Sequence, residues 1–203
     1  MPIQIPDAGE LRDKVRVLEF VRVSPHRCRC AQVSESDTGQ KSAQWTWREK
    51  RKAWAKVTPT DRTAIFANTG VGGREVELIL RRQGLDLTNA IEWKKQFCFL
   101  TSVTPLGPGH LLVRAALAEP VECRIDGDKP MCFPAVRAEK YIRHAQEAPM
   151  SVNDRALVLV TPKQVTLTPG HLVWVKDEPW EILVPHELDP YKNEYELGRR
   201  VEL

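Results

Sequence analysis

The segment Glu75-Val76-Glu77-Leu78-Ile79-Leu80-Arg81 decides the fold class of this chain. Its apolar residues Val76, Leu78 and Leu80 alternate with charged residues. A period of two places successive side chains on opposite faces of an extended strand. We therefore expect a β-strand that turns one face to a core and the other to solvent.

Similar segments lie on both sides of this strand. Val15 and Val17 alternate with basic residues before it, and Phe97 and Phe99 share one face of a segment after it. Tryptophans at short spacing also favour buried strand faces. The predicted core residues are Val15, Val17, Trp47, Trp54, Leu78, Leu80, Phe97, Phe99, Trp174 and Trp180. The fold class is therefore mainly β, with long loops between the strands.

The chain is expected to divide into four parts: an extended N-terminal arm over 1–9, a β-barrel over 10–120, a linker over 121–154 and a C-terminal β module over 155–203. The linker is rich in turn residues. A short helix is predicted within it, because Ala138, Tyr141, Ile142 and Ala145 have the spacing of one helix face.

Residues 78–118 and 157–201 share a weak internal pattern. Each begins with an apolar strand, Leu78-Ile79-Leu80 or Leu157-Val158-Leu159, and a Leu-Thr turn entry and a tryptophan strand follow. Two interpretations fit this pattern. The chain contains either two copies of one small barrel or a single larger β fold.

Composition excludes several classes of protein. The 203 residues are 42% hydrophobic and 28% charged, as in a globular chain with a core. The net charge of +3 is too small to indicate nucleic-acid binding by itself. No run of about 18 apolar residues occurs, so no membrane helix or membrane partner is expected. The five cysteines have no disulfide-like spacing and are expected to be free thiols.

No catalytic, cofactor or metal site is predicted. His26-x-Cys28-x-Cys30 lacks the spacing of a zinc pair and a second pair of ligands. His186-Glu187-x-Asp189 offers acid–base groups but no nucleophile, and we interpret it as a capped turn. The protein is therefore expected not to be an enzyme.

Contacts with other molecules are expected from two polar stretches, 24–43 and 58–73, and from a basic run that lies between tryptophans. The residues predicted to make these contacts are Arg27, Arg29, Arg48, Lys50, Arg51, Arg62, Asn68 and Arg74. Basic side chains beside tryptophans suit non-specific contact with DNA phosphates.

The stretch from Ala8 to about Glu119 resembles the phage head–tail joining, or head-closure, family. The resemblance rests on Gly9-Glu10-Leu11-Arg12-Asp13-Lys14-Val15, on Trp54-Ala55-Lys56-Val57-Thr58-Pro59 and on the strand that begins at Phe97. It implies that the mainly β fold is a small SH3- or OB-like β-barrel with long loops, which forms a homo-oligomeric ring in the neck of a tailed phage. Residues 120–203 have no counterpart in that family, and the family's basic stretch near the fourth strand is weak here.

The resemblance also implies partners and a location. The ring would join a portal or adaptor protein to tail-terminator or tail-tube proteins and help retain packaged DNA. Its location would be the virion, assembled in the bacterial cytoplasm. Three alternatives remain open: a tail terminator or tail-completion protein of the same particle, a nucleic-acid-binding β-barrel, and an enzyme with a β-barrel body.

Overall fold

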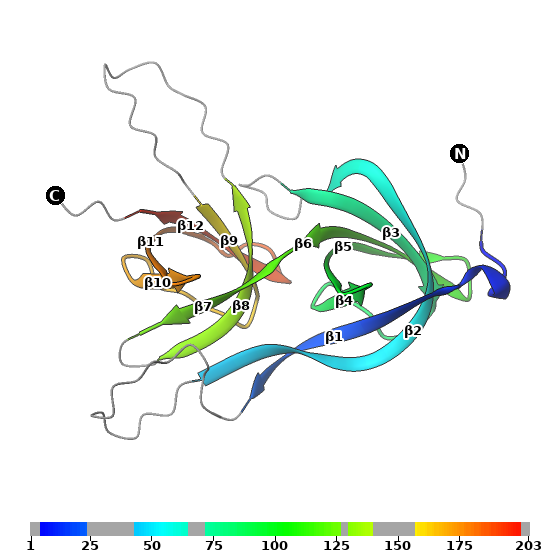
Figure 1. Ribbon diagram of the computed structural model, residues 1–203, viewed down its shortest axis with the longest axis horizontal. Coiled ribbons are helices and arrows are strands. Elements are labelled where there is room, and N and C mark those ends of the chain that lie inside the picture. The colour runs from blue at the N-terminus through cyan, green and yellow to red at the C-terminus, as the bar shows by residue number, and fades with distance from the viewer. Residues whose placement is uncertain (1–4, 24–42, 65–71, 127–129, 140–156, 200–203) are drawn as a thin grey trace, which may run out of the picture. The chain divides into compact units, whose positions relative to one another are not determined.

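The computed structural model describes residues 5–23, 43–64, 72–126, 130–139 and 157–199. These residues form twelve strands and one short 3-10 turn at Ala8–Glu10, with no α-helix among them (Figure 1). The strands are β1 Asp13–Val23, β2 Ala43–Ala64, β3 Gly73–Arg81, β4 Asn89–Trp93, β5 Gln96–Leu106, β6 His110–Ala118, β7 Pro120–Ile125, β8 Met131–Glu139, β9 Leu157–Pro162, β10 Leu172–Val175, β11 Glu178–His186 and β12 Lys192–Gly198. The expected mainly β fold is confirmed.

Strands β1 to β6 form the first barrel. They are hydrogen-bonded in the order β1-β4-β5-β6-β3-β2, and pairing of β1 with β2 closes the sheet. Its interior holds the predicted core residues Val15, Leu78 and Leu80, each fully buried, in one apolar cluster. The alternation that predicted these strands arises because every second side chain points into this interior.

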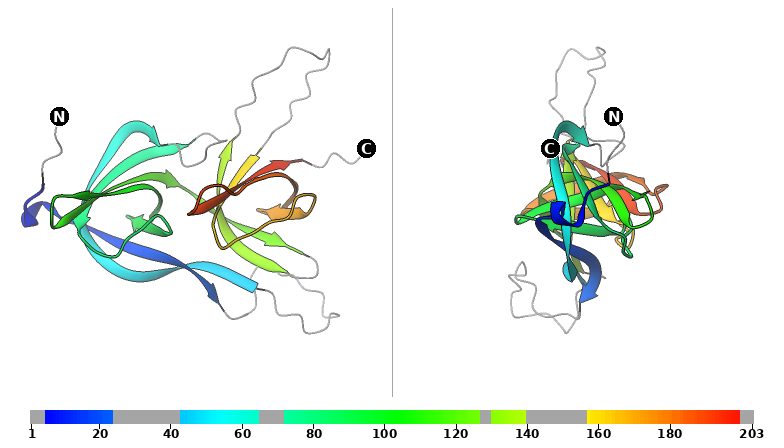
Figure 2. Two further views of the ribbon diagram at one scale, coloured as in Figure 1. Left: turned by 180° about the vertical axis from the view of Figure 1, so that it is seen from behind. Right: turned by 90° about the vertical axis from the view of Figure 1, so that its right-hand side faces the viewer.

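Strands β7 to β12 form the second barrel. Their order is β8-β7-β10-β11-β12-β9, and pairing of β9 with β8 closes this sheet in turn. Figure 2 shows these strands, green to red, from two further sides. The last residues of β1, Phe20–Val23, and the first residues of β2, Ala43–Thr46, belong to the same compact unit as the second barrel. Ala43 pairs there with Met131 of β8.

The two barrels have the same topology. If β7 to β12 are matched in order with β1 to β6, the order of neighbouring strands around the two closed sheets is identical. The match extends to local detail at positions 82 residues apart. Equivalent two-residue turns have φ of 49° and then 66°, and equivalent register shifts interrupt the same strand pair. These positions are Lys94-Lys95 with Lys176-Asp177 for the turns, and Leu100/Ser102 with Ile182/Val184 for the shifts. Two copies of one barrel, rather than a single larger β fold, therefore explain the internal sequence pattern.

Two expected elements are corrected by the structure. The stretch 121–154 is not a linker at its start, because it contains most of β7 and all of β8. Ala138, assigned to a helix from its spacing, lies in β8, and the rest of that predicted helix is outside the described residues. The turn residues around Gly127 join these two antiparallel strands. They are therefore a hairpin signal rather than a linker signal.

The stretch 58–73, expected to be an irregular loop, is also partly strand. β2 continues to Ala64, with a register shift between Pro59 and Thr63 against β3. Proline and the shifted residues weakened the alternation that would have predicted a strand here. Residues 24–42 and 65–71, which make up most of the predicted loops, are outside the described residues.

Candidate functional site

The outer face of β2 in the first barrel is the main candidate site. Ala53, Ala55 and Val57 pack against the barrel core, so the residues between them point outward. This places basic side chains and one tryptophan along a single stripe. We call it the basic face, which consists of Arg48, Lys50, Lys52, Trp54 and Lys56.

Trp54 was predicted to lie in the core, and that prediction is wrong. Its side chain is 57% exposed, whereas the adjacent Ala55 is fully buried. Adjacent residues of a strand face opposite ways, and the small Ala55 takes the inward position here. The two-residue spacing of Lys52, Trp54 and Lys56 was the sequence signal that places Trp54 on the charged face.

Exposed carboxylates pair with the cations of the basic face. Arg48 Nη2 lies 2.7 Å from Glu19 Oε1, and Lys56 Nζ lies 2.7 Å from Glu10 Oε2. The hydrogen bond from Arg48 lowers the pKa of the Glu19 carboxyl below its usual value. Exposed ion pairs of this kind are screened by solvent and contribute little to stability, so an incoming phosphate can compete for the cations.

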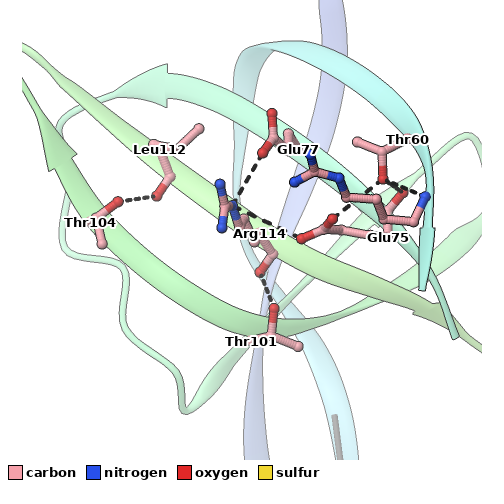
Figure 3. A network of polar contacts seen from close by, with 8 residues as sticks. Thr60, Glu75, Glu77, Thr101, Thr104, Leu112 and Arg114 are labelled. Carbon is pink, nitrogen blue, oxygen red and sulfur yellow. Dashed lines mark hydrogen bonds and ion pairs between the residues drawn. The ribbon is translucent and has the colours of Figure 1, made fainter. Parts of the chain in front are cut away.

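The outer face of β3 and β6 has a different character. Arg114 Nε lies 3.1 Å from Glu77 Oε1 and 3.9 Å from Glu75 Oε1 (Figure 3). Thr60 Oγ1 donates to the carbonyl oxygen of Glu75 at 3.2 Å, and Thr101 Oγ1 donates to that of Arg114 at 3.1 Å. Two carboxylates around one guanidinium leave this face without the positive charge of β2.

The other predicted contact residues are spread over the chain. Arg51 is half-buried and its Nη2 donates to the Gly84 carbonyl, so it ties down the loop between β3 and β4. Arg62 and Arg74 are exposed on β2 and β3. The predicted contact residues Arg27, Arg29 and Asn68 lie outside the described residues.

Several predicted core aromatics lie outside the barrel interior. Phe97 and Phe99 are buried, but they alternate with Cys98 and Leu100, which belong to the interior cluster. Half-buried Trp47 packs against Phe97 with ring centroids 5.5 Å apart. Of the remaining predicted core residues, Val17 and Trp180 are buried, and Trp174 is half-buried.

The hairpin formed by β11 and β12 carries a second candidate surface. Six large apolar side chains of the described residues are exposed, and four of them belong to this hairpin: Leu183, Val184, Leu188 and Tyr191. Leu188 at the tip is fully exposed. Asp189 Oδ1 accepts hydrogen bonds from the backbone N–H groups of Tyr191 and Lys192 at 2.8 and 3.2 Å, which makes this segment a capped turn.

Potential metal ligands and thiols are further candidates for a functional site in the described part of the chain. No three His, Cys, Asp or Glu side chains come together there in a way that could hold a metal ion. Burial raises the pKa of the Cys98 and Cys123 thiols to about 12, and burial also raises the pKa of Cys132. These thiols stay protonated near neutral pH and are poor nucleophiles. Cys28 and Cys30 lie outside the described residues.

Among the described residues, no helix has the length and apolar character needed to cross a membrane. Comparisons of the chain with protein-family models, with curated proteins and with solved structures found no match.

Proposed function

We propose that this chain is a structural component of a tailed-phage neck, a head-closure or head–tail connector protein that forms an oligomeric ring between portal or adaptor and tail. The observation that carries the proposal is the pair of closed barrels with identical topology. A closed sheet has no free edge for uncontrolled strand pairing, so it is a rigid unit whose contacts come from outer faces and hairpins. The Gly9-to-Val15 and Trp54-to-Pro59 segments add the family resemblance.

The two candidate surfaces suit separate tasks in such a ring. The basic face of the first barrel offers cations for the phosphates of packaged DNA, with Trp54 among them. Phosphate contacts of this kind position a protein on DNA without reading its sequence. The apolar β11–β12 hairpin of the second barrel suits contact with protein.

The test is reconstitution of the neck. The purified chain is mixed with the portal or adaptor protein and with the tail-terminator or tail-tube protein of the same phage, and the mixture is separated by size and imaged by electron microscopy. We expect a ring of this chain bound to at least one of the two. Failure to bind either protein at high concentration would refute the connector role.

One observation favours a second candidate function, a nucleic-acid-binding barrel. Trp54 is exposed between Lys52 and Lys56, as a base-stacking side chain would be. Filter binding of single-stranded DNA over a range of salt concentrations tests this function. Trp54→Ser should weaken binding about 5- to 150-fold, the loss for about 1–3 kcal/mol of stacking. Lys176→Glu on the second barrel is the charge control. Tight binding to DNA without any affinity for neck proteins would favour this second function.

A further inference from the structure

The equivalent hairpins of the two barrels have related tips. In the first barrel the β5–β6 tip reads Leu106-Gly107-Pro108-Gly109-His110, and in the second the β11–β12 tip reads Leu188-Asp189-Pro190-Tyr191-Lys192. Both have leucine, then proline two residues later, and end on a nitrogen-bearing side chain at the start of the next strand. The two tips therefore occupy equivalent positions in the two barrels, although the β5–β6 pairing continues to Leu106 and His110, whereas the β11–β12 pairing ends at His186 and Glu194.

The tip in the first barrel is covered by the chain's own N-terminal segment. A Cβ on Gly107 would come within 2.8 Å of Ile5 Cδ1, so the isoleucine side chain lies directly on this turn. Pro6 beside it is buried, and Leu106 is half-buried. Gly107 has φ of +63°, and the absence of a side chain there leaves room for Ile5.

The tip in the second barrel has no such cover among the described residues. Leu188, the counterpart of Leu106, is fully exposed, and Tyr191 takes the place of Gly109 and adds apolar surface. A cluster of exposed large apolar side chains is typical of a protein contact. Ile5 itself keeps 53% of its surface exposed, so it can touch a second surface while it stays on its own turn.

We propose that the β11–β12 hairpin of one copy docks on the Ile5-bearing end of the first barrel of a second copy. Ile5 then lies between two equivalent hairpins, with Gly107 of its own chain on one side and Leu188 of the neighbouring copy on the other. The two contributing surfaces differ, so the contact is heterologous and repeats from copy to copy, as a ring requires. The inference rests on the proposed function and names the contact between copies that builds the ring.

Sedimentation and light scattering from about 1 to 100 µM test the contact, because this concentration range detects self-association of micromolar affinity. Leu188→Asp and Ile5→Asp should each weaken self-association about tenfold or more, because each replaces an apolar side chain that the contact would bury with a charged one. Lys176→Asp, which adds the same carboxylate at an exposed turn of the second barrel outside both proposed surfaces, is the matched control and should associate as the unchanged chain does. Thermal melting of each variant checks that its fold is retained, with Leu188→Ser and Ile5→Ser as milder replacements.

The decisive experiment mixes the two aspartate variants. The Leu188→Asp copy keeps its Ile5 surface and the Ile5→Asp copy keeps its Leu188 surface, so the mixture should form one-to-one dimers and nothing larger. A monomeric unchanged chain, or a mixture that forms no dimer, would overturn the proposed contact. Retained self-association of Leu188→Asp with lost binding to a tail protein would also overturn it, and would assign the hairpin to that partner. The binding of each variant to portal and tail proteins reports on the connector role separately.

Discussion

Replacement of Tyr195 by phenylalanine tests how the second barrel holds its longest described connection, the segment between β9 and β10. Tyr195 lies on β12 and is fully buried. Its hydroxyl donates to the Val165 carbonyl oxygen at 3.0 Å and accepts from the backbone N–H of Leu167 at 3.1 Å. Burial raises the pKa of this hydroxyl to about 12, so it stays protonated and able to donate near neutral pH.

The expected loss follows from the partners left behind. The Val165 carbonyl keeps a second donor, Asn193 Nδ2, at 2.9 Å, whereas the Leu167 N–H loses the partner that Tyr195 supplies in the interior. A buried donor left without a partner costs about 1–3 kcal/mol of unfolding free energy. Hydrogen exchange at the Leu167 amide should then accelerate about 5- to 150-fold, if it exchanges through opening of this barrel.

The assay is urea unfolding followed by tryptophan fluorescence, together with amide exchange at Leu167. Tyr191→Phe is the matched control, because Tyr191 lies in the same barrel but is partly exposed. Its unfolding free energy should change by less than about 0.5 kcal/mol. A Tyr195→Phe protein as stable as the unchanged chain, or an equal loss in Tyr191→Phe, would refute this account of the segment.

Two further predictions follow from thiol burial and from the matched turns. Burial raises the pKa of Cys98 and Cys123 to about 12 in the folded chain, whereas the unfolded thiols ionise near their ordinary value of 9. The stability that each protonated thiol contributes is therefore complete below pH 9 and falls as the pH rises toward 12. At pH 10.5 the loss is about 1–2 kcal/mol of unfolding free energy per thiol. Urea unfolding at alkaline pH should show a smaller loss in Cys98→Ala and in Cys123→Ala than in the unchanged chain. Lys95 and Asp177 both have a left-handed backbone conformation with φ of 66°, which glycine adopts without strain. Lys95→Gly and Asp177→Gly should therefore each raise the unfolding free energy by a similar amount, about 0.5–1 kcal/mol. Thermal melts that show a large gain at one turn and a loss at the other would contradict the equivalence of the two turns.

The strands that line each barrel were predictable where one face is apolar and the other charged. Val76, Leu78 and Leu80 predict β3 because the same alternation that forms a core also appears in the sequence. Closure of the sheets was not predictable in the same way. It depends on pairings such as Val15 with Trp93, which join residues far apart in the chain and leave no local signal.

The candidate site was predicted only in part. The basic run at Arg48 and Lys50 was recognised, but Trp54 was assigned to the core because tryptophan is usually buried. The two-residue period of a strand places Trp54 on the charged face instead, because Trp54 is two residues from Lys52 and from Lys56. The exposure of Leu188 had no sequence signal, because half-buried Leu106 likewise precedes a proline by two residues at the equivalent tip.

One matched pair of positions shows how two barrels of the same topology differ in their side chains. Arg16 of β1 pairs across the sheet with Glu92 of β4, and the equivalent Arg124 of β7 pairs with Trp174 of β10. The first pair is a salt bridge, whereas in the second the guanidinium lies 5.2 Å from the indole centroid. A carboxylate stays beside both arginines, because Arg124 Nε also lies 3.1 Å from Asp126 Oδ1. The arginine therefore keeps its cross-strand position in both barrels, while its partner across the sheet changes from a carboxylate to an aromatic ring that attracts the cation. The two barrels thus keep one topology and differ in their surface side chains, as the charged face of β2 and the apolar β11–β12 hairpin also show.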